Sequence, residues 1–476
     1  MSESTSRTKN LLKYVLPAIL TNACIFLFTI VDGIFVGSGV GSGALGAVNI
    51  AMPFVMIATA LNMLTSIGGV TVTAIRLGRH DKEGANQAFM HSLTANFLIA
   101  AIITLLGTVC ATPLCRMLGA DDAYLPMVRE YVFFWSLFAI PSALSVNFQS
   151  FCRNDGSPML VAIATVASTV LNIFLDWLFV FPLKMGVMGA AIATGISKTV
   201  SWLIVLMHFI LRKGELRIRK YKPEAKLFRK VVFRGLPEMI AQFATPVTTI
   251  CLNHVLLANL GSEGVDTFAV ISYVASFAMS VLFGVAEGVQ PLFGQSYGAK
   301  EEDGLKFYFR SGMLISLIGS SLCVELAVIF ARPVSMLFGA EGSIIDATVK
   351  YMPQYAWAFI VAGLNTLISA YFYSTKRSVQ AIILNVARSF VINIAVIVGL
   401  SALLGSSIVW VYLRNFGGCR VCDRVCAVEA FRTSGYRLQI INETGKPGSY
   451  PIRAFQLFYT DSRGDALMIP GRFLPY

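Results

Sequence analysis

Two aspartates lie far inside runs of apolar residues. Asp32 is 20 positions into a run that starts near residue 12, and Asp176 is 17 positions into a run that starts near residue 159. In helices, both carboxyl groups would lie roughly 25–30 Å from the start of their run, at about 1.5 Å per residue. Acidic residues at bilayer depth are costly, and by default they serve an ion or a substrate.

Two neutral oxygen-bearing side chains are expected at the same depth. Asn172 precedes Asp176 by four residues, so one helix face carries both. Thr194 lies about seven residues inside the outer end of the next apolar run. Two carboxylates, an amide and a hydroxyl form an oxygen cage of the kind that hard cations prefer. Without Na⁺, neighbouring buried carboxylates can hold a proton instead. The pattern therefore predicts a site for H⁺ or Na⁺ and does not choose between them.

The remaining intramembrane ionisable residues leave alternatives open. Glu287, near the inner end of its run, is a candidate substrate-binding residue that lines a cavity, or a side chain that snorkels to water. Lys198 and Arg388 could neutralise an acid, or snorkel to the inner face. His208 and His254 lack metal-ligand spacing, so packing is the simpler interpretation and no metal site is assigned.

The composition indicates which elements must position these groups. Of 476 residues, 56% are hydrophobic and 13% are charged, and the mean hydropathy is +0.69. Soluble domains carry about 25% charged residues. A soluble enzyme, a secreted disulfide scaffold and a disordered chain are excluded, which leaves a polytopic helical membrane protein. The net charge of +12 comes from scattered basic residues, so no nucleic-acid partner is expected.

Eleven apolar runs are long enough to cross the roughly 30 Å hydrocarbon core. They lie at about 12–36, 47–75, 89–111, 127–151, 159–181, 187–211, 236–260, 267–293, 307–330, 351–373 and 379–404. With a cytoplasmic N-terminus, the inner segments hold 22 Lys and Arg and the outer segments hold five. The positive-inside rule therefore predicts an N-terminus in the cytoplasm.

A basic segment at 212–235 separates an N-terminal lobe, 1–211 with spans one to six, from a C-terminal lobe, 236–409 with spans seven to eleven. We interpret it as a solvated cytoplasmic linker near anionic lipid. The two lobes match at a nearly fixed offset. Pro17 and Pro237 are 220 residues apart, and so are Tyr131 and Tyr351. Six spans per unit place both units in the same orientation, which predicts a parallel pseudo-two-fold repeat.

The repeat also helps to distinguish residues that build the scaffold from residues that form a functional site. Prolines and glycines recur in both halves, whereas the position matching Asp32 is near Leu252 and that matching Asp176 is near Ile397. Acids that occur in one lobe only favour a functional interpretation over a structural one.

Three strings resemble the multidrug and toxic compound extrusion (MATE) family. They are IVDGIFVG at 30–37, RNDGSP at 153–158 and QPLFGQSYGA at 290–299. The resemblance runs from about 11 to about 409. It implies an all-α polytopic protein with two six-helix lobes, which exports bulky lipophilic, often cationic, compounds in exchange for a cation.

In bacterial relatives of this type, the resemblance implies a cation site in the N-terminal lobe. Its aspartate, asparagine, aspartate and threonine match Asp32, Asn172, Asp176 and Thr194. The acids that another branch carries in spans seven and ten have no counterpart here, since Thr245 and Ala370 occupy the approximate places. A second cation site is therefore not expected in the C-terminal lobe.

The tail at 410–476 departs from the pattern. The repeat predicts a twelfth span at about 408–432, but five charged residues between 414 and 429 argue against one. Cys419, Cys422 and Cys426 lack a fourth ligand for zinc. We favour a shifted reading frame or chimeric end over a genuine peripheral tail, and in that case the chain could be a non-functional truncated transporter.

The expected function is antiport of H⁺ or Na⁺ against lipophilic or cationic small molecules, by a multi-pass monomer in the cytoplasmic membrane. No cofactor beyond the coupling ion is expected. The main rival is a flippase of lipid-linked saccharides or precursors, which needs several basic residues in its cavity to hold pyrophosphate lipids. A membrane enzyme or receptor is less consistent, because no catalytic constellation is present and the chain is duplicated.

Overall fold

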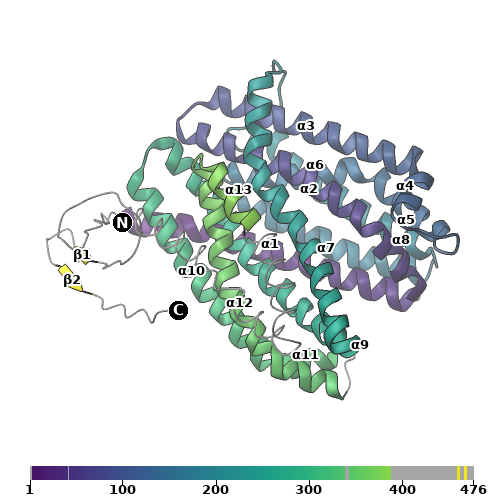
Figure 1. Cartoon of the computed structure of the whole chain (residues 1–476). Helices are drawn as coiled ribbons and strands as arrows, with labels where there is room; N and C mark the ends of the chain where they lie inside the picture. Colours follow the sequence, from purple (N-terminus) through teal and green to yellow (C-terminus); the bar gives the residue numbers. More distant parts are fainter. Residues whose placement is uncertain (1–2, 41, 338–341, 388–457, 461–465, 469–476) are drawn as a thin grey trace. The chain divides into compact units, whose positions relative to one another are not determined.

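A computed structural model describes residues 3–40, 42–337, 342–387, 458–460 and 466–468. Apart from two short strands near the C-terminus, the described chain is helical (Figure 1). The helices of the first half are α1 (Glu3–Gly39), α2 (Ser42–Gly78), α3 (Lys82–Val109), α4 (Ala111–Met117), α5 (Leu125–Leu137), α6 (Ala139–Asn154), α7 (Pro158–Val180) and α8 (Gly186–Ile210). Those of the second half are α9 (Ala225–Ala299), α10 (Glu302–Ile329), α11 (Ala331–Leu337), α12 (Ser343–Ser374) and α13 (Ser378–Val386).

Eight helical segments of the described part are long and apolar enough to cross a membrane, or nine if one bent pair counts as a single span. The bent pair is α5 and α6, which meet at 50° where the sequence predicts one span at 127–151. Pro141 lies in the first turn of α6. Proline donates no backbone hydrogen bond, and its ring clashes with the carbonyl four residues earlier, here that of Leu137, the last residue of α5.

The spans predicted at 236–260 and 267–293 both lie within α9, which is 75 residues long. The last turns of α2 touch both ends of α9: Gly68 approaches the backbone of Val231, and Gly78 approaches that of Gln295. A straight helix would separate Val231 from Gln295 by about 96 Å, but Gly68 from Gly78 by only about 15 Å. Helix α9 therefore folds back on itself, as its ribbon does in Figure 1.

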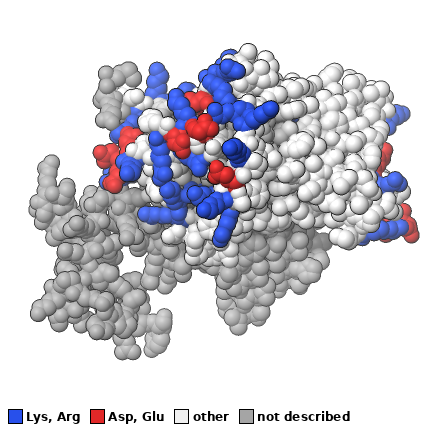
Figure 2. All heavy atoms as spheres, turned by 90° about the horizontal axis from the view of Figure 1, so that it is seen from above, with Lys and Arg blue, Asp and Glu red and all other residues white. Residues whose placement is uncertain are grey.

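Charged side chains gather at the ends of the helices. Figure 2 shows many Lys and Arg with some acidic residues at one end, a smaller charged group at the other, and uncharged surface between them. Large apolar side chains are exposed on this surface, for example Leu98, Ile102 and Leu105 along one face of α3. An exposed apolar helix face of this kind fits lipid, so the chain is a multi-pass membrane protein.

The basic linker is not a free loop in the described structure. Its first part lacks regular structure and packs on α3, and its second part, from Ala225, is already α9. The backbone N–H of Arg217 donates to Asn86 (2.6 Å), that of Glu224 donates to His91 (2.8 Å), and the Tyr221 hydroxyl donates to Thr94 (2.7 Å). The linker is therefore held against the first lobe.

The chain divides into two compact units, Met1–Gly417 and Gly418–Tyr476. In the second unit the structure describes β1 (Phe458–Thr460) and β2 (Ala466–Met468), which pair antiparallel with Phe458 opposite Met468. The predicted twelfth span, Arg388 and the three tail cysteines lie outside the described residues.

Candidate functional site

Helices α1 and α7 run side by side in the first lobe, and their contacts fix the level of the two aspartates. At one point of contact, Gly39 of α1 lies against Val180 of α7. Lower down, Phe28 of α1 lines the same small pocket as Thr169. The contact of Gly39 with Val180 pairs positions 141 apart, and Phe28 and Thr169 have the same offset, which places Asp32 near the level of Ile173. The Asp32 side chain therefore lies between the levels of Asn172 and Asp176.

Helix α8 runs antiparallel to α7 and brings Thr194 to the same level. The hydroxyl of Ser168 donates to the carbonyl of Ser197 (2.9 Å), which joins the two helices. Thr194 is three residues nearer the start of α8, so it lies level with about residue 171 of α7, one position from Asn172. The four predicted site residues thus share one level on three packed helices.

Several polar atoms of Asp32, Asn172 and Asp176 are buried without a well-formed hydrogen bond among the described residues. Asp176 and Asn172 are fully buried. Both carboxylate oxygens of Asp176, both amide atoms of Asn172 and one carboxylate oxygen of Asp32 lack a hydrogen bond of good geometry, although the Asn172 side chain lies close enough to interact with the Asp176 carboxylate. Native proteins pair the great majority of such atoms, so a cluster of unpaired ones needs an explanation. An oxygen-rich, buried site of this kind suits a small cation or a proton.

Tyr131 joins this cluster from α5, and sequence reasoning did not place it there. Its buried hydroxyl interacts electrostatically with both Asp32 and Asp176, and these two acids interact with each other. The sequence marked Tyr131 only as a member of the repeat, paired with Tyr351. Nothing in the sequence around Tyr131 indicates that it lies close to acids that are far away in the chain.

Glu287 lies elsewhere, on the face of α9 that meets the first lobe. Its Oε2 atom accepts hydrogen bonds from Arg153 of α6 (2.6 Å) and Asn22 of α1 (3.0 Å). The Arg153 side chain is 8% exposed and that of Glu287 is 26% exposed. The structure thus places this candidate substrate residue in an ion pair between the lobes.

Other contacts between the lobes lie at the same end of the helices. Arg7 pairs with Glu301 (2.6 Å), and Gln295 donates to the carbonyl of Asn154 (3.1 Å). On α1 the polar contacts with the described part of the second lobe extend from Arg7 to Asn22, which is ten residues, or about 15 Å, short of Asp32. The cation cluster therefore lies well away from this end of the interface.

The second sequence string, at 153–158, also has a structural role. The Asp155 carboxylate, 2% exposed, accepts from His208 (2.9 Å) and from the backbone N–H of Glu215 (2.8 Å). It thereby fixes the start of the linker to α6 and α8. His208 was expected to pack, and its buried ring does contact Phe209, but the sequence did not reveal Asp155 as its partner.

Cations crowd the end of the molecule where the linker lies. Burial and the neighbouring Arg79, Arg234 and Lys230 hold the pKa of Lys376, in the turn between α12 and α13, below its usual value. Like charges held this close favour an anionic partner at this surface, such as the phosphate groups of lipid.

Comparisons with known proteins agree with this architecture. A family model described as MatE matches residues 17–178 and, a second time, residues 237–398. The chain therefore belongs to the MatE family, a family of membrane transporters rather than enzymes. The two matches are offset by 220 residues, which confirms the predicted repeat.

Curated relatives match over most of their length. The multidrug export protein MepA of Staphylococcus saprophyticus is 22% identical over 432 residues, which cover 90% of this chain and 93% of the relative. The protein of the same name from Staphylococcus aureus is 22% identical over 428 residues, covering 89% and 92%.

Solved structures share the fold. A MATE protein in complex with MaL6 has a TM-score of 0.84 at 22% identity, covering 91% of this chain and 99% of that one. A MOP superfamily transporter from Pyrococcus furiosus, described as having a binding pocket of reverse polarity, has a TM-score of 0.83 at 24% identity, covering 90% and 96%. The predicted fold class, an all-α membrane protein of two lobes related by a parallel repeat, is confirmed.

Proposed function

We propose that this chain is an antiporter that exports lipophilic or cationic small molecules across the cytoplasmic membrane in exchange for H⁺ or Na⁺. The observation that carries the proposal is the set of unpaired, buried oxygen atoms on Asp32, Asn172 and Asp176, at one level of the first lobe. The names of the MepA relatives, which export drugs, support the substrate class.

The chemistry of the cluster explains how exchange can occur. Two neighbouring carboxylates in a buried site cannot both stay charged without a counter-charge, so they bind a proton, a sodium ion or the positive charge of a substrate. Since one set of carboxylates serves both ligands, binding of one weakens binding of the other. Coupling needs only that the two ligands favour different conformations of the protein.

The contacts between the lobes support a state that is closed at the cytoplasmic end. With the N-terminus inside, the polar contacts that Arg7 and Asn22 of α1 make with the second lobe lie near the cytoplasm. The cluster at Asp32 then lies toward the outside. In such a state, ions reach the acids from the outer face.

The test is transport by the purified protein in liposomes. Efflux of a fluorescent lipophilic cation is measured under an imposed proton or sodium gradient for the wild type, Asp32→Asn and Asp176→Asn. Each substitution removes one carboxylate, and we expect ion-driven efflux to fall at least about tenfold in both variants.

A matched control is Asp122→Asn, which makes the same chemical change in an exposed side chain between α4 and α5. Its ion pair with Arg116 lies on the surface, where such pairs contribute little, so efflux should stay near the wild-type rate. Ion-driven efflux that survives in both Asp32→Asn and Asp176→Asn refutes the proposed coupling.

A further inference from the structure

A lysine lies halfway along a membrane-spanning helix of the first lobe. Lys198 is 12 residues from each end of α8, which runs from Gly186 to Ile210. At 1.5 Å per residue, about 18 Å of helix separates it from either end, which is too far for a lysine side chain to bridge by snorkelling. A cation held at this depth is costly and marks a functional site with a definite partner.

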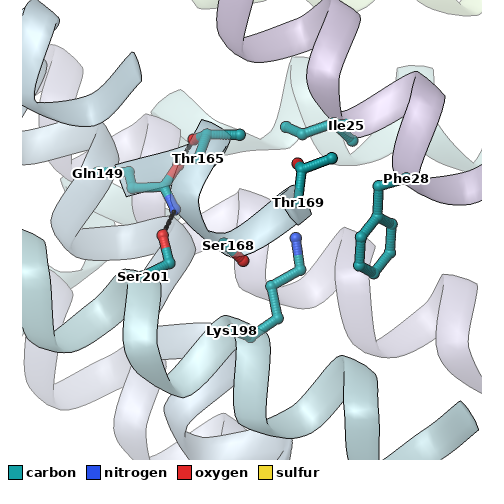
Figure 3. Close-up of a pocket in the computed structure, with 8 residues that line it drawn as sticks. All are labelled: Ile25, Phe28, Gln149, Thr165, Ser168, Thr169, Lys198 and Ser201. Atoms are coloured by element: carbon teal, nitrogen blue, oxygen red, sulfur yellow. Dashed lines mark hydrogen bonds between the residues drawn. The ribbon is translucent and has the colours of Figure 1, made fainter. Parts of the chain in front are cut away.

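The ammonium group points into a small polar pocket (Figure 3). The hollow is partly open, and its cavity volume is about 10 Å³, room for about one water-sized group. On one side the Lys198 Nζ atom lies 4.9 Å from the centre of the Phe28 ring, a favourable position for a cation. The pocket's other polar side chains come from α6, α7 and α8, and they are Gln149, Thr165, Ser168, Thr169 and Ser201.

Most of these polar groups already have partners within the protein, while the ammonium has none among the described residues. Gln149 donates to Ser201 (3.0 Å) and accepts from Thr165 (3.4 Å), and Ser168 donates to a backbone carbonyl. Within the part of the chain that the structure describes, no carboxylate forms an ion pair with Lys198, and no acceptor takes a hydrogen bond from it. The ammonium faces the ring of Phe28 instead.

The pocket adjoins the cation cluster. Phe28 precedes Asp32 by four residues on α1, and Lys198 follows Thr194 by four residues on α8. The ammonium group thus lies about one helical turn, roughly 6 Å along the helix axis, from the level of the carboxylates. One lobe therefore carries a positive and a negative group about one helical turn apart.

We propose that Lys198 binds a carboxylate of the transported compound, so that the preferred substrates carry both a positive charge and a carboxylate. The proposal builds on the antiport function above and names its substrate class. A compound with positive charge alone is repelled by Lys198. A purely anionic compound would bind better when a cation occupies Asp32 and Asp176. The compound and the cation would then be transported in the same direction, not in exchange.

A compound with both charges satisfies both conditions. Its positive group competes with the coupling ion for Asp32 and Asp176, which exchange requires, and its carboxylate accepts hydrogen bonds from Lys198, which has three donors to offer. The ring of Phe28 adds an aromatic surface beside the lysine for a lipophilic ligand.

The test compares two dyes that differ in a single group: rhodamine B, which carries a carboxylate beside its positive charge, and its ethyl ester, which carries only the positive charge. Equilibrium binding to the purified protein is followed by fluorescence polarisation. We expect the wild type to bind rhodamine B about tenfold more tightly than the ester, as a charge-assisted hydrogen bond implies.

Three variants isolate the lysine. Lys198→Met should abolish the preference by weakening binding of rhodamine B, while binding of the ester stays equal or improves, which also shows that the variant is folded. Lys198→Arg should keep the preference. Lys350→Met is the matched control, because Lys350 also lies over an aromatic ring, at 5.2 Å from that of Tyr351, but is exposed.

Equal affinities for the two dyes in the wild type, or an unchanged preference in Lys198→Met, would overturn the proposal. The outcome is separate from that of the antiport test. If ion-driven efflux of the ester depends on Asp32 but no preference depends on Lys198, the antiport proposal stands and the proposed carboxylate site is refuted. If a preference for rhodamine B depends on Lys198 but efflux does not depend on Asp32, the carboxylate site stands and the proposed ion coupling is refuted.

Discussion

Arg153 and Glu287 form an ion pair of 2.6 Å that joins helix α6 of the first lobe to helix α9 of the second. Asn22 of α1 donates to the same carboxylate oxygen, so three helices meet at one acid. Arg153 is almost fully buried and Glu287 is 26% exposed, so water reaches the pair only in part. It is therefore positioned to hold the two lobes together at the end where the basic linker lies.

Breaking this ion pair should open that end of the interface. In Glu287→Gln the buried guanidinium of Arg153 loses its charged partner, which costs roughly 1–3 kcal/mol for a pair that is partly reached by water. Distances between spin labels across the cytoplasmic ends of α6 and α9 should shift toward longer values. The double variant Arg153→Glu with Glu287→Arg should restore the short distances at least in part, and distances that stay short in Glu287→Gln contradict this role.

Two glycines let α9 approach α1 closely. Added Cβ atoms at Gly284 and Gly288 would lie 2.6 Å from the Cα of Ile19 and 2.7 Å from that of Val15. These are backbone atoms that cannot move aside, so Gly288→Val should lower the melting temperature and weaken contact between the lobes. Gly319→Ala is the control, because an added Cβ there meets nothing within 4 Å. Since alanine favours a helix, it should be neutral or stabilising by about 0.5–1 kcal/mol.

Tyr131→Phe should weaken cation binding without unfolding the protein. The change removes one buried hydroxyl that interacts with Asp32 and Asp176 and leaves the ring in place. Loss of one hydrogen-bonding group near the site predicts about a tenfold rise in the cation concentration needed for half-maximal efflux. Tyr355→Phe is the control, a partly buried tyrosine of the second lobe with no carboxylate acting on it among the described residues. Equal effects of the two changes would assign Tyr131 to packing alone.

Asp155→Asn should release the linker from the first lobe. The substitution removes a charged acceptor from His208 and from the N–H groups of Glu215 and Leu216. We expect a loss of roughly 1–3 kcal/mol in stability and faster hydrogen exchange at 215–224. Asp303→Asn changes an exposed aspartate at the start of α10 and should alter neither measurement. Unchanged exchange in Asp155→Asn argues against an anchoring role.

The sequence was most informative where a physical quantity follows directly from position along the chain. Counting residues from the start of each apolar run predicted that Asp32, Asn172, Asp176 and Thr194 share one level, and the contacts between α1, α7 and α8 place them so. This works because a helix advances by a fixed rise per residue. The parallel repeat was predicted from prolines and tyrosines that match at a fixed offset.

The sequence was least informative about pairs of residues that are far apart in the chain. Arg153 and Glu287 are separated by 134 positions, and no local pattern relates them. The same holds for Tyr131 and the aspartates. Lys198 allowed two interpretations in the sequence, and only its place midway along α8 and its pocket beside Phe28 favour a binding role. The break between α5 and α6 could have been predicted, since Pro141 alone marks it.

The most direct test of the exchange at Asp32 and Asp176 is the release of protons when substrate binds. The purified protein is titrated with a lipophilic cation in weakly buffered solution, and the change in pH is recorded with and without Na⁺. We predict that the wild type releases protons on binding, that Na⁺ suppresses the release, and that Asp32→Asn with Asp176→Asn releases none. Proton release that is the same in the double variant as in the wild type would contradict the account, because the charge exchanged would then come from other groups.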